Sequence, residues 1–134
     1  MQPLPEPTPP ASGWVPPSEF DEFHLMHVLG RGAMGVVYLA HDRSLERQVA
    51  VKFIATPQPD AEARTNFQVE ARAIARLQHP NVATVFRVGE VRGHPYIVSE
   101  YVMGQSLAEL PVPVPWRRVL TLGVGLTRGL AAAH

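Results

Sequence analysis

The sequence contains no cysteine, which excludes a disulfide framework and thiolate-ligated metal sites. It also has no excess charge: 12 Lys and Arg residues balance 12 Asp and Glu residues, so bulk electrostatics favour neither nucleic acid nor an anionic membrane as a partner. No apolar run is long enough to cross a bilayer. These absences favour a cytoplasmic, reducing compartment, and 134 residues are enough for one small domain with its own core.

The first 22 residues are rich in proline and poor in periodic apolar residues. Residues 1–17 hold seven of the 14 prolines, and they lack the basic and then apolar pattern of a signal peptide. Because proline has no backbone N–H, we expect residues 1–22 to be a disordered or polyproline-like leader. A solvated leader is the favoured interpretation, and a ligand for a proline-binding module is the alternative.

Three glycines and a valine, Gly30, Gly32, Gly35 and Val37, follow the pattern G-x-G-x-x-G-x-V. Glycines at this spacing let the backbone turn and bring its N–H groups close to a phosphate. Dinucleotide-binding folds carry a similar pattern but need a helix after the third glycine. Here a β-branched and aromatic run at 36–40 predicts a strand instead, and a second strand is expected over 48–54. The pattern therefore predicts a β-hairpin with glycines at its bend.

The second strand ends in Val49-Ala50-Val51-Lys52, and together with the glycine bend it resembles the amino-terminal lobe of a bacterial-type serine/threonine protein kinase. This resemblance implies an α+β fold. Residues 23–102 would form a five-stranded antiparallel sheet, one long helix and the hinge. Residues 103–134 would be the start of a truncated second lobe, whose last helix begins near residue 115 and is apolar on nearly every face.

The resemblance also implies an ATP site. Glu100 and Val102 would present backbone groups to the adenine edge, and Ser99 would be a small gatekeeper that opens a pocket behind the ring. Met103 departs from the acidic or polar residue that relatives often place near the ribose. The full set of implied ATP contacts is Leu29, Gly30, Arg31, Gly32, Ala33, Met34, Gly35, Val36, Val37, Ala50, Lys52, Ser99, Glu100 and Val102.

A helix is predicted from about residue 61 to 77, after Asp60 as its N-cap. Its apolar stripe comprises Phe67, Ala71, Ile74 and Leu77, and Glu70 falls within that stripe. One interpretation is a glutamate at the edge of the stripe that reaches water. The favoured one, implied by the resemblance, is an ion pair in which Glu70 orients Lys52 toward the ATP phosphates, so that these two are the catalytic residues of this part. The histidines show no metal-ligand spacing, and no metal site is expected.

The sequence has no H-R-D, D-F-G or A-P-E motif. In kinases these motifs supply the catalytic aspartate and the Mg²⁺ ligands, so Mg²⁺ is expected only in an intact enzyme and residues 1–134 alone are expected to be inactive. The leading hypothesis is a fragment of a kinase that phosphorylates serine or threonine of a protein substrate. The alternative is a natural truncation that acts as a nucleotide- or protein-binding module.

Overall fold

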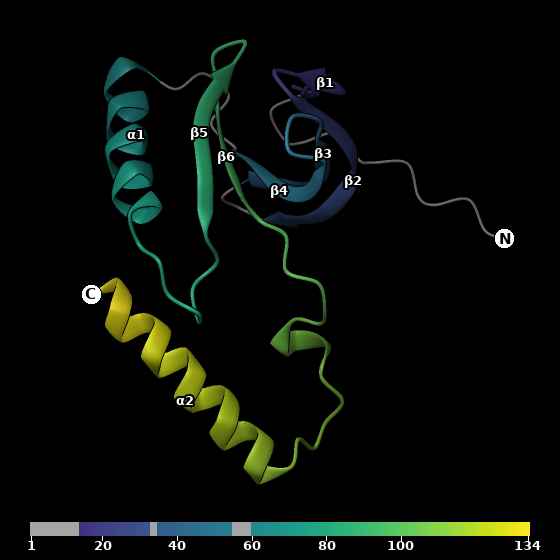
Figure 1. The fold of residues 1–134 in the computed structure, drawn as a ribbon, viewed down its shortest axis with the longest axis vertical. Helices are drawn as coiled ribbons and strands as arrows, with labels where there is room; N and C mark the ends of the chain where they lie inside the picture. Colours follow the sequence, from purple (N-terminus) through teal and green to yellow (C-terminus); the bar gives the residue numbers. More distant parts are fainter. Residues whose placement is uncertain (1–13, 33–34, 55–59) are drawn as a thin grey trace, which may run out of the picture.

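The computed structural model describes residues 14–32, 35–54 and 60–134. Within them, six antiparallel strands form one sheet in the order β1-β2-β3-β4-β6-β5 (Figure 1). The strands are β1 (Glu19–Phe20), β2 (Phe23–Gly32), β3 (Gly35–Asp42), β4 (Arg47–Ile54), β5 (Val85–Val91) and β6 (His94–Glu100). The expected kinase-like sheet is therefore present, with one strand more than the five predicted.

The additional strand corrects the extent of the leader. Residues 14–22 belong to the fold, because β1 pairs with β2 and because Pro16 and the Phe20 ring are buried. Trp14 also packs against the core cluster. The density of prolines suggested an unfolded segment, but burial of these aromatic rings offsets the entropy cost of ordering it. Residues 1–13 of the expected leader lie outside the described residues.

One face of the sheet is closed by an aromatic and aliphatic core. The strand β4 shows the alternation: Val49, Val51 and Phe53 are buried, whereas Ala50 and Lys52 between them are half-buried. The tightly packed rings of Phe20, Phe53 and Tyr96 have centroids 5.0 to 6.0 Å apart. The buried cluster consists of Phe20, Phe23, Ala40, Val49, Val51, Phe53, Tyr96 and Val98.

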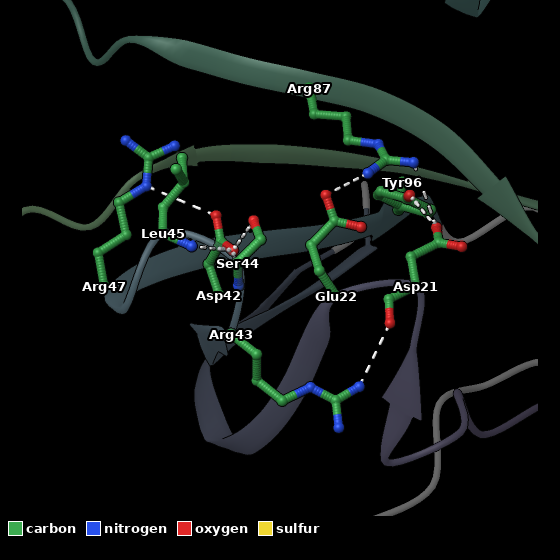
Figure 2. Close-up of polar contacts among 9 residues, drawn as sticks. All are labelled: Asp21, Glu22, Asp42, Arg43, Ser44, Leu45, Arg47, Arg87 and Tyr96. Atoms are coloured by element: carbon green, nitrogen blue, oxygen red, sulfur yellow. Dashed lines mark hydrogen bonds and ion pairs between the residues drawn. The ribbon is translucent and has the colours of Figure 1, made fainter.

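Polar contacts join the two ends of the sheet. Arg87 on β5 pairs with Glu22, and it lies 3.7 Å from Asp21 in the turn between β1 and β2 (Figure 2). The buried Tyr96 donates its hydroxyl hydrogen to Asp21 Oδ2 at 2.6 Å. Because β1 and β5 are the two edges in the strand order, these contacts show that the sheet curls around its core.

The turn between β3 and β4 is held by the buried carboxylate of Asp42 (Figure 2). Its Oδ1 accepts hydrogen bonds from the Ser44 hydroxyl at 2.8 Å and from the backbone N–H groups of Ser44 and Leu45. Burial raises the pKa of Asp42, but these bonds and the charge of Arg47 outweigh it, and the pKa of Asp42 is lowered. An ionised side chain thus fixes the hairpin turn.

The helix α1 (Ala61–Ala75) begins at Asp60, whose side chain accepts a hydrogen bond from the Ala63 N–H at 2.8 Å. The predicted cap is confirmed. The helix ends two residues before the predicted Leu77, in a turn closed by the Leu77 N–H on the Ile74 carbonyl. It packs on β5 and β6, beside β5 in Figure 1. The alternating run at 82–91 predicts the next strand, and the observed β5 starts three residues later, at Val85.

After β6 the chain forms a short 3₁₀ helix, η1 (Leu107–Glu109), and then α2 (Trp116–Ala133). Gly129 of α2 meets the loop after α1 so closely that an added Cβ would lie 2.7 Å from the Asn81 carbonyl oxygen. Neither α1 nor α2, the α-helices of the described part, is long and apolar enough to span a membrane. Large apolar side chains remain exposed on α2: Trp116, Val119, Leu120, Leu122, Val124, Leu126 and Leu130.

Candidate functional site

The glycine bend lies where β2 turns into β3, as the sequence predicts. Gly30 pairs with Val37 and Gly32 pairs with Gly35 across the two strands. Gly35 has a φ of 140°, in the region that residues with a Cβ rarely adopt, so glycine is required there. Added Cβ atoms at Gly30 and Gly32 would meet nothing within 4 Å in the structure, so their backbones can be approached closely. Ala33 and Met34, at the tip, lie outside the described residues.

A row of half-buried side chains crosses the sheet next to this bend, on the face opposite the core. Val37 pairs with Lys52, and Lys52 pairs with Ile97. One step along, Ala50 pairs with Ser99. Directly paired residues point to the same side of a sheet, as do residues two apart, so these five side chains share one face. That face places the Lys52 ammonium group among three apolar side chains and the Ser99 hydroxyl.

Three other predicted contacts lie away from this row. Leu29 is the extra residue of a bulge, because Val28 and Gly30 pair with consecutive residues of β3, and its side chain is 40% exposed. Val36 pairs with Phe53 and therefore lies on the core face, and Arg31 pairs with Val36. We call the face that carries the Lys52 row, opposite the core, the half-open face. Any contact of Arg31 or Val36 with a ligand on the half-open face must use backbone atoms.

The predicted hinge follows β6. The Glu100 N–H donates to the Thr84 carbonyl at 2.8 Å, and its carboxylate accepts from the Thr84 N–H at 3.2 Å. These bonds tie the end of β6 to the residue before β5. Beyond them, Val102 and Met103 are exposed and lie outside any helix or strand. Val102 is thus open to solvent, just after the strand that carries Ser99.

The predicted pair of Lys52 and Glu70 is not formed in this structure. No ion pair joins them among the residues described. The expectation that Glu70 lies in a buried stripe is also wrong, because Glu70 is exposed and Ile74 is 47% exposed. Ala71 is the buried residue of α1, and its neighbour Glu70 is rotated from it by about 100° around the helix axis.

Sequence reasoning missed two side chains of this face. Ile97 lies between Lys52 and Val88, and Leu39 pairs with Ala50. Their positions follow from the alternation that placed Ser99 and Val37, since each lies two residues away from one of them. No three His, Cys, Asp or Glu residues gather to hold a metal ion within the ranges that the structure covers.

Comparison with known proteins gives curated relatives that are bacterial kinases. The chain is 41% identical over 117 residues to serine/threonine-protein kinase PknK of Mycobacterium tuberculosis (strain ATCC 25618 / H37Rv), which covers 84% of this chain and 10% of PknK. It is 34% identical over 116 residues to serine/threonine-protein kinase PrkC of Bacillus subtilis (strain 168), covering 84% of this chain and 18% of PrkC. The chain therefore spans less than a fifth of the length of these relatives.

Solved structures give the same result for the fold. The Mycobacterium tuberculosis PknI kinase domain superposes with a TM-score of 0.70 at 31% identity, over 92% of this chain and 51% of that domain. The family described as "Protein kinase domain" matches residues 23–133. Because this match covers most of the chain and begins at β2, the chain belongs to the protein kinase family, as the N-terminal part of a bacterial serine/threonine kinase domain.

Proposed function

We propose that this chain forms the ATP-binding lobe of a serine/threonine protein kinase. The intact enzyme would transfer the γ-phosphate of ATP to a serine or threonine hydroxyl of a protein substrate. The observation that carries the proposal is the row of half-buried side chains, in which Val37, Ala50, Lys52 and Ser99 share one face beside the glycine bend. Because ATP is made and used inside cells, the proposal also places this lobe in the cytoplasm.

Each part of the row has a distinct task in the proposal. Val37 and Ala50, with Leu29 at the bulge, cover the adenine ring with apolar surface. The Lys52 ammonium pairs with phosphate oxygens as a point charge. The backbone N–H groups of the bend, from Gly30 to Gly35, approach the same phosphates. Backbone groups of Glu100 and Val102 contact the adenine edge.

Glu70 enters the proposal through a movement of α1. In the present arrangement the helix contacts β5 and β6, and Glu70 faces solvent. A rotation of the helix about its axis, with a shift toward β4, would bring Glu70 toward Lys52. A bound nucleotide favours this state if it interacts better with Lys52 when the ammonium is oriented by Glu70. The open arrangement and a paired arrangement are then two states of one lobe.

Residues 1–134 alone are proposed not to catalyse phosphoryl transfer. Transfer needs positioning together with charge stabilisation by metal ions and a residue that orients the nucleophile. The half-open face carries apolar groups and one cation rather than a set of carboxylates, so it does not fit Mg²⁺. The proposal therefore assigns Mg²⁺ ligands to other residues of the intact enzyme. Robust phosphotransferase turnover by purified 1–134 would contradict this part.

The nucleotide site can be tested with Lys52→Ala. The variant should weaken ATP binding by about tenfold or more, because a charge-assisted contact is lost, while adenosine binding stays unchanged. Gln48→Ala is the matched control, since Gln48 is exposed on the same strand and the same face, four residues away. Equal ATP affinities of Lys52→Ala and the unmodified chain, measured by calorimetry, would remove Lys52 from the phosphate site.

Lys52 is the only lysine of the sequence, which allows a second test. An amine-reactive adenosine analogue should label one side chain, and excess ATP should protect it. Labelling that ATP does not reduce would contradict the proposed placement. The alternative of a natural truncation is separated by the intact mass of the native product. A mass well above 14.7 kDa supports the kinase, and a mass that matches the chain supports a binding module.

A further inference from the structure

The residues just before the kinase match are folded onto the sheet. The match begins at Phe23, yet the described segment from Trp14 to Glu22 packs against strands that lie up to 80 residues further along the chain. Phe20 is buried in the core, and the Asp21 and Glu22 side chains contact Arg87. We call residues 14–22 the N-terminal strap. It is continuous with the lobe rather than a separate leader.

Trp14 of the strap contacts aromatic rings on two different strands of the sheet. Its ring is stacked on His94, with centroids 3.7 Å apart and an angle of 17° between the planes. It also meets the Phe53 ring edge-on, at 5.4 Å and 66°. His94 is the first residue of β6, and Phe53 is next to the last residue of β4. Trp14 therefore covers the end of the sheet where β4 finishes and β6 starts.

Helix α1 is joined to the sheet at this same end. The chain leaves β4 at Ile54, directly after Phe53, and enters the helix at Asp60. In its first turns, Arg64 pairs with Glu90 at 3.9 Å. The Arg64 guanidinium also lies 3.4 Å from the position of a Cβ added to Gly93, the residue before His94. Ile54, where the chain leaves β4, and Gly93, beside Arg64, are thus each next in the chain to a residue whose ring Trp14 contacts.

The base of α1 sets where Glu70 can reach. Arg64 and Glu70 are six residues apart on the helix, a rise of about 9 Å, so a small change of angle at the base becomes a displacement of the carboxylate. We propose that Trp14 is a positioning residue for α1: stacked on His94 and against Phe53, it holds the two strand ends beside which the first turns of the helix are anchored. Any effect of Trp14 on catalysis rests on the proposed function, because Trp14 would act through the orientation of Glu70 and Lys52.

Hydrogen exchange of the full-length protein tests the positioning of α1 directly, because the measurement does not depend on enzymatic activity. Trp14→Ala should raise the exchange rates of α1 amides by about tenfold, because loss of a stacked aromatic contact frees the base of the helix. Amides of the β2–β3 hairpin should change by less than about twofold. Trp14→Phe should keep most of the protection. Val15→Ala, at a neighbouring side chain that is 60% exposed, should match the unmodified protein.

A variant in the hydrophobic core separates positioning of α1 from general destabilisation of the lobe. Phe23→Leu removes aromatic packing on Phe20 and Tyr96, and its ring pairs with neither of the rings that Trp14 contacts, so exchange should rise throughout the sheet. If Trp14→Ala gives that same uniform pattern, Trp14 is a core residue only and the proposal is wrong. The proposal is also wrong if α1 exchange is unchanged.

Kinetics of the full-length protein test the consequence. Trp14→Ala should lower kcat about tenfold and leave the KM for ATP within about twofold, because the adenine contacts are intact and only the orientation of the phosphates suffers. Trp14→Phe should restore most of kcat. An unchanged or increased kcat would overturn the link to catalysis. Full turnover by Lys52→Ala would instead contradict the proposed nucleotide site, and the exchange result on α1 would stand independently of it.

Discussion

The hydroxyl group of Tyr96 gives a sharp test of how the sheet is closed. Tyr96→Phe keeps the ring in the core, where it is fully buried, and removes one hydrogen bond, the 2.6 Å contact with Asp21 Oδ2. A hydrogen bond to a charged group stabilises a protein by about 1.5–3 kcal/mol. The Asp21 side chain is 43% exposed and keeps Arg87 at 3.7 Å, so water and Arg87 recover part of the loss. We expect a destabilisation of about 1.5 kcal/mol.

Urea unfolding followed by circular dichroism measures this loss. With a slope of about 1.5 kcal/mol/M, the midpoint should fall by roughly 1 M, and the slope should stay constant because the surface exposed on unfolding does not change. Tyr38→Phe is the matched control. No hydrogen bond of the Tyr38 hydroxyl occurs within the described part of the chain, and its removal should cost less than about 0.5 kcal/mol.

The pH dependence provides a second readout of the same bond. Burial raises the pKa of Tyr96 above its ordinary value of 10, and the hydrogen bond to Asp21 raises it further. A group whose folded-state pKa is raised contributes stability below its unfolded pKa and loses it as the pH rises further. The unmodified chain should therefore lose stability above pH 10, and Tyr96→Phe should lose less. A variant within about 0.5 kcal/mol of the unmodified chain at neutral pH, with the same alkaline profile, would refute the reasoning.

Three further predictions concern the site and its surroundings. Ser99→Met should weaken binding of ATP-site ligands that carry bulky aromatic extensions while sparing ATP, and equal affinities would exclude a pocket behind the adenine. Burial lowers the pKa of His94, the charge of Arg64 lowers it further, and the charge of Glu90 opposes both. The free energy of unfolding should therefore fall as the pH drops below about 6.5. His94→Gln should remove this loss. Gly89→Ala should cost about 1–3 kcal/mol in urea unfolding, because its Cβ would lie 2.5 Å from a buried tyrosine ring.

The hairpin and its lysine were predictable because their signals are local. Gly35 adopts a φ of 140°, a conformation that glycine adopts readily and other residues rarely do. The alternation of β4 places Lys52 opposite Val37. The cap at Asp60 has the same local origin, since its side chain bonds the N–H three residues later. Signals of this kind depend on neighbours within a few positions, so one sequence is enough to reveal them.

The strap was not predictable because its partners are distant. Trp14 contacts His94, and Asp21 contacts Tyr96, across separations of about 80 and 75 residues. Within the strap itself the prolines are the strongest local signal, and they restrict the backbone to extended conformations without showing whether the segment packs. An extended segment can still pair as the short edge strand β1, provided that its few aromatic rings find a core to enter.

The relation between Lys52 and Glu70 shows a different limit. Their charges and order predict that they can pair, but they do not determine where a helix sits. An ion pair between groups that reach solvent contributes only about 0–1 kcal/mol, comparable with the 0.5–1.5 kcal/mol of one aromatic contact such as that of Trp14 with His94. The packing of the helix on β5 and β6 therefore decides the resting position, and the pair alone is too weak to override it. Under the proposed function, a nucleotide that binds the paired state better than the open one shifts the equilibrium toward pairing, so nucleotide binding and the position of α1 should be coupled.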